Sequence, residues 1–172
     1  MIKKWLAFIV IGLFFSVFSA CGTTRDSSKL SSKADSAKEA QLREVIITLA
    51  REMVGTKYKS NGKKPGGFDC SGLVYYVFGR MEIPMAANAA GQAELGSKID
   101  LDEAKPGDLL FFSTGKNISH VGIITENSKK ILKLVHSSSS RGVIEENILN
   151  SDYWVRRMRK VTSLKSYPKK PS

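Results

Sequence analysis

One stretch decides the fold: Phe68-Asp69-Cys70-Ser71-Gly72-Leu73-Val74-Tyr75-Tyr76-Val77-Phe78. Asp69 is one of the residue types that cap helix N-termini, because its short side chain can accept hydrogen bonds from the free backbone N–H groups there. The apolar residues after it recur at helical spacing and predict one buried face. We therefore expect a helix whose first turn holds Cys70 and whose buried residues are Leu73, Val74, Val77 and Phe78.

The first turn of a helix changes the chemistry of a thiol. Free backbone N–H groups and the helix macrodipole stabilise a thiolate there, so we expect the pKa of Cys70 to be lowered. The loop over residues 60–67 contains glycines and lysines, but no Gly-Lys-Ser/Thr sequence ends it. It therefore predicts a turn before the helix and not a phosphate-binding loop.

A longer helix is expected upstream of this stretch. Ser36 and Glu39 have the spacing of a capping box. Apolar residues from Leu42 to Met53 then recur at helical intervals, and Gly55 is a typical residue just beyond a helix end. The pattern predicts an amphipathic helix over residues 37–54.

The second half of the chain has the short apolar runs and turn signals of strands. The predicted strands are residues 109–112, 118–125, 131–136, 143–144 and 153–158. Helices that come first and strands that cluster afterwards indicate an α+β fold with an antiparallel sheet.

The chemistry-bearing side chains are few, since Cys70 is the only cysteine of this part of the chain and His120 and His136 are the only histidines. A thiol at a helix start, a histidine within a strand and a second histidine on the next strand can serve as nucleophile, base and orienting group. Each also has an ordinary structural explanation, as a small buried thiol or a core histidine. No C-x-x-C pair or close histidine pair supports a metal site, and we predict no cofactor.

The N-terminus has the layout of a secretory signal. Lys3 and Lys4 precede an apolar run over residues 5–18, which is short for a membrane-spanning helix. Ser19-Ala20 are small, and Cys21 follows them. Residues 22–36 are polar and predict a flexible tether.

Length and composition limit the class of protein. The 172 residues correspond to about one domain, 42% hydrophobic and 25% charged residues are globular values, and two cysteines exclude a disulfide-rich scaffold. The net charge is +11, but residues 151–172 hold seven basic residues against one acidic residue, which is +6 of the total. This placement, with no recognition-helix or zinc-finger pattern, argues against nucleic-acid binding.

Several motifs, taken together, resemble the NlpC family of cell-wall cysteine peptidases, and most of all its lipid-anchored murein endopeptidase lipoproteins. They are Gly55-Thr56-Lys57-Tyr58, Phe68 to Val74, Ile83-Pro84, Gln92, Gly96, Pro106 to Phe112, His120 to Ile123, His136-Ser137-Ser138, Gly142-Val143 and Tyr153-Trp154. The resemblance covers about residues 40–160. It implies a papain-like domain in which the nucleophile helix packs on the sheet.

The resemblance also implies function. It assigns Cys70 as nucleophile, His120 as base and His136 as orienting residue, and it places Tyr58, Ser71 and Gln92 at the oxyanion or substrate region. The expected reaction is hydrolysis of peptidoglycan stem peptides or crosslinks at a γ-D-glutamyl–diamino acid or D-alanyl–diamino acid bond. Residues 59–62 and 85–88 depart from the usual family sequence where substrate binds.

The N-terminal segment separately resembles a lipoprotein signal, with Phe18 where Leu is usual. That implies cleavage before Cys21, lipidation of its sulfur and anchoring in the cell envelope. Because Gly22 and not Asp follows, the expected location is the outer membrane, facing the periplasm, if the source has two membranes. The predicted organisation is a signal peptide over 1–20, a tether over 21–36, a catalytic domain over 37–163 and a basic disordered tail over 164–172.

Two other classes of function remain open from the sequence. A non-catalytic envelope lipoprotein could bind the cell wall, but all three site residues are present. A thiol acyltransferase of related fold is the second alternative, but the permuted members of that group place the histidine before the cysteine, and here the order is Cys70, His120, His136.

Overall fold

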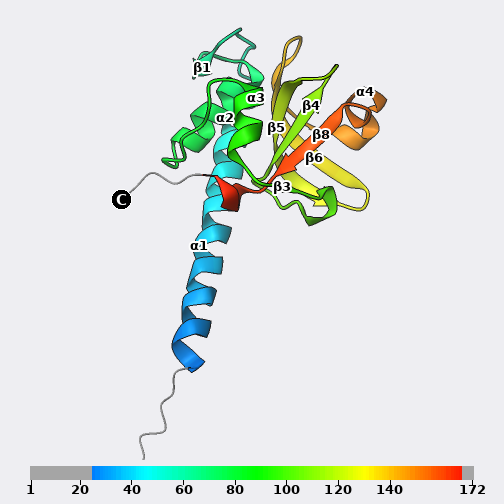
Figure 1. Ribbon diagram of the computed structural model, residues 1–172. Helices are drawn as coiled ribbons and strands as arrows, with labels where there is room; N and C mark the ends of the chain where they lie inside the picture. The colour runs from blue at the N-terminus through cyan, green and yellow to red at the C-terminus, as the bar shows by residue number, and fades with distance from the viewer. Residues whose placement is uncertain (1–24, 168–172) are drawn as a thin grey trace, which may run out of the picture.

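The computed structural model describes residues 25–167. Helices cover one face of an antiparallel sheet, and the first helix extends well beyond the domain (Figure 1). The α+β, papain-like fold expected from the sequence is confirmed. The predicted signal peptide, Cys21 and residues 168–172 lie outside the described residues.

The sheet that carries the fold has six strands in the order β3-β8-β4-β5-β6-β7, and every neighbouring pair is antiparallel. Its strands are β3 (Lys98–Ile99), β4 (Leu109–Ser113), β5 (Ile118–Ser128), β6 (Ile131–Ser138), β7 (Gly142–Asn147) and β8 (Met158–Thr162). A separate hairpin pairs β1 (Lys63–Lys64) with β2 (Gly67–Phe68). The α-helices are α1 (Arg25–Glu52), α2 (Cys70–Gly79), α3 (Ala89–Leu95) and α4 (Asp152–Val155). Single 3₁₀ turns span Leu101–Glu103, Ile148–Asn150 and Leu164–Ser166.

Both faces of the sheet are buried, and β4 shows how. Leu109 and Phe111 point to the helices and join the main core, while Leu110 and Phe112 point to the other side and join a second cluster. This strand is therefore buried at every position, and its sequence is continuously apolar, as expected for a two-sided strand. The helix residues predicted to be buried in α2 are all fully buried.

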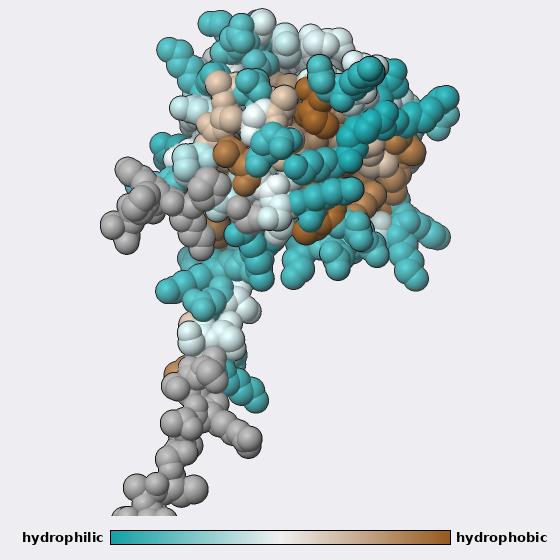
Figure 2. Space-filling view, viewed as in Figure 1, coloured by the Kyte–Doolittle hydropathy of each residue, from teal (hydrophilic) through white to brown (hydrophobic). Residues whose placement is uncertain are grey.

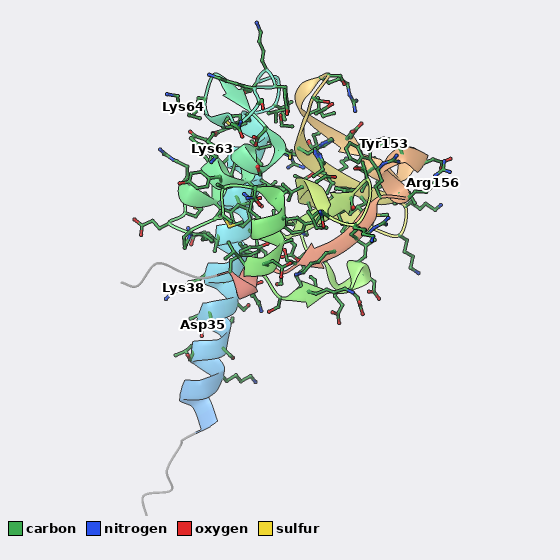
Figure 3. The ribbon with its side chains drawn as sticks, turned by 45° about the horizontal axis from the view of Figure 1, so that its top comes forward. Asp35, Lys38, Lys63, Lys64, Tyr153 and Arg156 are labelled. Atoms are coloured by element: carbon green, nitrogen blue, oxygen red, sulfur yellow. The ribbon has the colours of Figure 1, made fainter. Side chains whose placement is uncertain are left out.

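The first helix begins at Arg25, so the flexible tether expected over residues 21–36 is wrong from residue 25 onward. Residues 29–38 are exposed throughout, and Leu30 is 71% exposed. A helix nucleated by its packed part, around Ile46 and Ala50, extends at low cost through Lys, Ala and Ser residues. The protruding part is largely hydrophilic to neutral (Figure 2). Asp35 and Lys38 lie near its upper end (Figure 3), where they line a hollow together with Leu164 and Lys165.

This protruding segment spans residues 25–38 and is about 20 Å long at the α-helical rise per residue. It is therefore a stiff spacer where a coil was expected. Among residues 25–167, none of the helices combines the length and hydrophobicity needed to cross a membrane.

Residues 153–158 do not form the predicted strand. Ser151 accepts backbone hydrogen bonds from Trp154 and Val155, which starts the short helix α4, and the strand begins only at Met158. Trp154 is thereby turned toward the two histidines, at ring-centroid distances of 4.9 Å from His120 and 5.1 Å from His136.

The C-terminal tail predicted over residues 164–172 is also wrong at its start. Leu164 and Tyr167 are each only 3% exposed and belong to the main core. The Tyr167 ring packs edge-on against Phe78, and its hydroxyl is 2.5 Å from the Thr162 hydroxyl. The domain therefore extends at least to Tyr167.

Candidate active site

The start of α2 is built around Asp69. Its carboxylate Oδ1 accepts a hydrogen bond from the backbone N–H of Gly72 at 2.6 Å and another from the Ser71 hydroxyl at 3.0 Å. Gly72 packs directly on the preceding loop, since a Cβ there would lie 1.8 Å from the carbonyl oxygen of Gly62. The glycine after Cys70-Ser71 thus lets the loop close over the helix start and fixes the thiol at the first turn.

The pKa of Cys70 is raised, which contradicts the lowered pKa expected from the helix N-terminus. Burial is the largest cause, because it disfavours the charged thiolate, and the nearby negative charge of Asp69 adds to it. Backbone hydrogen bonds from Val121, Ser71 and Cys70 itself oppose the shift. The acidic cap that completes the helix therefore offsets the dipole that was expected to ionise the thiol.

The two histidines are hydrogen-bonded to each other. Neighbouring antiparallel strands β5 and β6 carry them on one face of the sheet, and His120 Nε2 lies 2.9 Å from His136 Nδ1. Gly122 makes room for this arrangement, because a Cβ there would be 3.2 Å from the Cβ of His136. The strand pairing expected from the sequence thus brings the two rings together.

A carboxylate continues the chain of hydrogen bonds behind His136. Glu146 Oε1 lies 2.9 Å from His136 Nε2, and Arg141 Nη2 donates to both Glu146 oxygens at 2.9 Å. Trp154 Nε1 donates to the same Oε1 at 3.0 Å. The Glu146 pKa is lowered: burial raises it, but the bonds from Arg141 and His136 outweigh that effect. Glu146 is therefore an anion, and its Oε1 accepts a hydrogen bond from the Nε2–H of His136.

This carboxylate determines the tautomers of both rings. A neutral imidazole has one N–H and one acceptor nitrogen. Because His136 donates to Glu146 through Nε2, its Nδ1 is the acceptor, and His120 must donate to it through Nε2–H. The Nδ1 of His120 is then left without a proton, in the state that a general base for the thiol requires.

Both imidazoles are neutral at neutral pH. The pKa of His120 is lowered to about 3. Burial is the main cause, the repulsion between His120 and His136 when both are protonated adds to it, and Glu146 acts in the opposite direction. Burial also lowers the pKa of His136 below its ordinary value, despite the hydrogen bond that His136 donates to Glu146. Trp154 stacks on His120 with an interplanar angle of 25°, and this ring supplies part of the apolar surroundings. With a raised thiol pKa beside it, the resting pair is a neutral thiol and a neutral imidazole.

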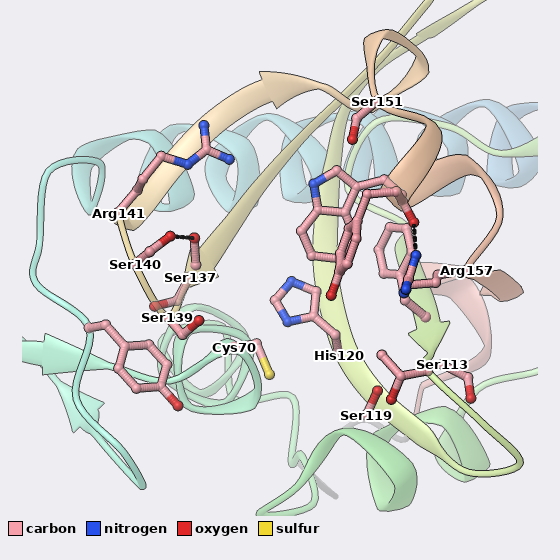
Figure 4. A pocket seen from close by; sticks show the side chains of 16 residues that line it. Cys70, Ser113, Ser119, His120, Ser137, Ser139, Ser140, Arg141, Ser151 and Arg157 are labelled. Carbon is pink, nitrogen blue, oxygen red and sulfur yellow. Dashed lines mark hydrogen bonds between the residues drawn. The ribbon is translucent and has the colours of Figure 1, made fainter.

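Cys70 and His120 line one pocket of about 610 Å³. Its wall also contains Tyr58, Ser119, Tyr153 and Trp154. The close view shows the sulfur and the His120 ring turned into the same space (Figure 4). Tyr58, which the family resemblance assigns to the oxyanion or substrate region, is 40% exposed and lies on this wall. The structure thus brings Cys70, His120, His136 and Tyr58 into one site.

The side chains of Ser71 and Gln92, which the family resemblance also assigns to the oxyanion or substrate region, do not line this pocket. The Ser71 hydroxyl is turned to Asp69 and to the carbonyl of Ala87, so only its backbone N–H faces the thiol. Gln92 is 0% exposed and donates from Nε2 to the carbonyls of Ser71 and Ala86, both at 2.9 Å. The prediction that Gln92 touches substrate is wrong, because its side chain joins α3 to the nucleophile helix.

Sequence reasoning missed Glu146, Arg141 and Trp154. Strand alternation carried a usable signal for Glu146, since residue 146 shares a sheet face with residue 144, which pairs with His136. Asp108 is a buried ion-pair partner of Arg43 at 2.8 Å. Within residues 25–167, no group of three histidine, cysteine or acidic residues is placed to hold a metal ion.

Comparison with known proteins identifies the domain. A model of the NlpC/P60 family matches residues 55–163. The chain belongs to the NlpC/P60 family. Among solved structures, the NlpC/p60 domain of the peptidoglycan hydrolase SagA is 27% identical with a TM-score of 0.61, and the comparison covers 71% of this chain and 98% of that one. A Staphylococcus aureus protein described as similar to lipoprotein, of the NLP/P60 family, is 28% identical with a TM-score of 0.63, covering 72% and 41%.

Three curated relatives carry names of enzymes. A gamma-DL-glutamyl hydrolase of Bacillus subtilis is 35% identical, over 71% of this chain and 30% of the relative. A probable endopeptidase NlpC of Escherichia coli is 39% identical, over 58% and 64%. The murein DD-endopeptidase MepH of E. coli is 33% identical, over 80% and 49%. The chain thus spans less than two thirds of the length of each of these relatives.

Proposed function

We propose that this NlpC/P60 chain is a cysteine peptidase that hydrolyses amide bonds in peptidoglycan stem peptides or their crosslinks. The observation that carries the proposal is the pocket shared by Cys70 and His120, with His120 hydrogen-bonded to His136 and His136 hydrogen-bonded to Glu146. Nucleophile, base and orienting groups in this order are the arrangement of a catalytic triad. The family and the names of its peptidoglycan-hydrolysing relatives supply the substrate class.

The chemistry starts from neutral partners. His120 Nδ1 accepts the proton of the Cys70 thiol while the sulfur attacks the amide carbonyl carbon. The carbonyl oxygen becomes an oxyanion beside the backbone N–H groups of Cys70 and Ser71 at the helix start. The carbon–nitrogen bond then breaks, and His120 returns the proton to the leaving amine.

The second half of the reaction releases the acyl group. Water gives a proton to His120 and attacks the thioester carbonyl, which frees a carboxylate product and restores the Cys70 thiol. His136 and Glu146 hold His120 in the required tautomer and stabilise it while it carries the positive charge. Trp154 covers the ring and limits the access of bulk water.

Two kinds of bond are candidates for cleavage. Of the relatives above, one is named a gamma-DL-glutamyl hydrolase and another a murein DD-endopeptidase. For this chain we propose, by analogy with these names, either a γ-D-glutamyl bond within one stem or a D-alanyl–diamino acid crosslink as the bond that is cleaved. Residues 59–62 and 85–88, which depart from the usual family sequence, are the segments where we expect this choice to be made.

A digestion of purified peptidoglycan by the full chain in detergent tests the activity and identifies the bond. Mass spectrometry of the fragments distinguishes dimers that fall to monomers, which indicates crosslink cleavage, from stems shortened to dipeptides, which indicates γ-D-glutamyl cleavage. Cys70→Ala is the inactive control. If neither the wild type nor Cys70→Ala releases fragments, with reductant present and on peptidoglycan of several stem chemistries, the proposed function is contradicted.

We further propose that Cys21 carries lipid and holds the enzyme at the cell envelope, in the outer membrane of a two-membrane cell. The small residues before Cys21 and the basic, apolar segment preceding them support this. Helix α1, which begins four residues after Cys21, would then hold the domain away from the bilayer. Expression with labelled palmitate tests the point: label on the wild type but not on Cys21→Ala is expected, and unlabelled wild type would contradict it.

A further inference from the structure

A second hollow adjoins the active-site pocket. It has a volume of about 490 Å³ and shares four wall residues with the pocket of Cys70: Ser113, Thr114, Tyr153 and Arg157. Its remaining wall residues are Gly115, Arg156 and Arg159. Because the two hollows have a common wall, a ligand in the first can extend into the second. We call the second hollow the arginine cleft.

The positive charge of the arginine cleft is largely uncompensated. None of its wall residues is acidic. Arg156 lies 3.4 Å from Asp152, but the two side chains are 75% and 91% exposed, so water and salt screen this pair. Arg157 donates to the carbonyl of Tyr153, and Arg159 donates to those of Arg156 and Met158. Three arginines therefore line one space, and among the described residues its wall contains no carboxylate.

Two of these arginines are held in fixed positions. The Arg157 guanidinium lies 3.7 Å from the ring centroid of Tyr153, and its Nη1 donates to the Tyr153 carbonyl at 2.9 Å. Its Nε is buried and has no hydrogen-bond partner. Arg159 is fixed by bonds of 3.1 and 2.9 Å from Nη1 to carbonyl oxygens. Figure 4 shows Arg157 beside the site, and Figure 3 shows Tyr153 and Arg156 together at α4.

This geometry suits a carboxylate. A guanidinium group presents parallel N–H donors that match the two oxygens of a carboxylate, and a guanidinium already held in place loses little entropy on binding. Stem peptides carry free carboxylates close to their scissile amide bonds. The arginine cleft is continuous with the catalytic pocket, as a site for a group on the reacting peptide should be. A site for a phosphate on a separate molecule would not require this continuity.

We propose that the arginine cleft binds a free carboxylate of the same peptide whose scissile bond lies at Cys70. The inference rests on the proposed function and deepens it, since the enzyme would discriminate stems with a free carboxylate from stems whose carboxylate is amidated. Arg157 contacts both hollows and would align the bound carboxylate with the reacting bond.

Steady-state kinetics on paired synthetic stem peptides tests the proposal with the full chain in detergent. The two members of a pair differ only in one carboxylate, which is free or converted to a primary amide. The free carboxylate is expected to raise kcat/KM by about 10- to 100-fold, as a charge-assisted hydrogen-bonded pair does. Arg156→Gln/Arg159→Gln, which changes exposed side chains, brings the ratio close to one. Arg157→Lys keeps the charge but loses the fork and gives an intermediate ratio.

Arg80→Gln is the matched control, because Arg80 is exposed at the end of α2 and outside both hollows. It should keep the full preference. Equal cleavage of every peptide pair by the wild type overturns the inference, and so does a preference that survives the Arg156/Arg159 change. In either case the proposed peptidase activity would still stand.

A binding measurement separates failure of the activity from failure of the cleft. In calorimetry with Cys70→Ala, the free-carboxylate peptide should bind about tenfold or more tightly than its amide, and the Arg156/Arg159 change should remove the difference. This result supports the cleft even if the wild type cleaves nothing. Glycerol phosphate is the competing probe: if it binds at the arginines and the peptide carboxylate does not, the cleft serves a phosphate-bearing molecule and the inference is wrong.

Discussion

Glu146 offers the sharpest test of how the site works. Its Oε1 accepts hydrogen bonds from His136, Trp154 and Arg141, while Oε2, among the described residues, accepts only from Arg141. In Glu146→Gln the amide oxygen can take the place of Oε1, so His136 keeps its tautomer, while the negative charge and the Arg141 hydrogen bond to Oε2 are lost. In Glu146→Leu the acceptor is lost as well, and the buried Nε2–H of His136 has no partner at that position.

The two substitutions therefore differ in expected magnitude. Replacing a charge-assisted bond by a neutral one costs about 1 kcal/mol, which lowers kcat roughly fivefold. Leaving the buried Nε2–H of His136 unpaired costs about 2–3 kcal/mol. If His136 avoids this cost by carrying its proton on Nδ1, His120 must accept at Nε2, and the His120 proton then lies on Nδ1, where the base must be free. We expect a fall of roughly 30- to 150-fold in kcat for the leucine variant. KM should change little, because Glu146 lies behind His136 and outside the pocket wall.

The assays are stem-peptide kinetics and ¹⁵N chemical shifts of the histidine rings. The wild type and the glutamine variant should show His120 protonated at Nε2 and bare at Nδ1, while the leucine variant should show a mixture. Glu145→Gln is the control, since Glu145 bonds Arg51 and Thr125 instead. Equal losses in both Glu146 variants, or a wild-type His120 protonated at Nδ1, would refute the tautomer argument.

Asp69, His120 and Gln92 can each be tested by a single substitution. Asp69→Asn keeps the helix cap but removes the negative charge that adds to the effect of burial on the pKa of Cys70. The rate of thiol alkylation, measured against pH, should therefore give a lower pKa for Cys70. An unchanged pKa would contradict the role of the Asp69 charge. The folded pKa of His120 is about 3 against 6.5 unfolded, so the unfolded state binds the extra proton below pH 6.5. The free energy of unfolding should then fall as pH drops through this window, by up to about 1.4 kcal/mol per pH unit, with a smaller slope in His120→Gln; equal slopes would count against it. Gln92→Ala should lower the free energy of unfolding in denaturant by about 1–3 kcal/mol, because two buried carbonyls lose their donor, and it should leave KM unchanged. A raised KM with unchanged stability would instead show that Gln92 contributes to substrate binding.

The parts of the fold that local pattern determines could be predicted from the sequence. The helix after Asp69 needs only a cap and one apolar face, and the strands around His120 and His136 need only apolar runs separated by turns. Because consecutive strands usually pair, the meeting of the two histidines also followed. Tyr58 reached the pocket as expected, although its place came from family resemblance.

The remaining features depend on tertiary context. Residues 25–36 have no apolar stripe, so nothing local distinguishes a coil from a helix propagated out of a packed segment. Leu164 and Tyr167 looked like part of a basic tail, yet burial against Phe78 decides their structure. The raised pKa of Cys70 depends on burial and on Asp69 together, and helix position alone gave the opposite sign.

The central claim is that Cys70 attacks the substrate and becomes acylated. The most direct measurement is intact-protein and peptide mass spectrometry of the full chain, quenched in acid during turnover of a stem peptide, with Cys70→Ala in parallel. We expect an adduct with the mass of the acyl half of the substrate, on the fragment that contains Cys70, and no hydrolysis by the alanine variant. Fragment release by Cys70→Ala at the wild-type rate would contradict it.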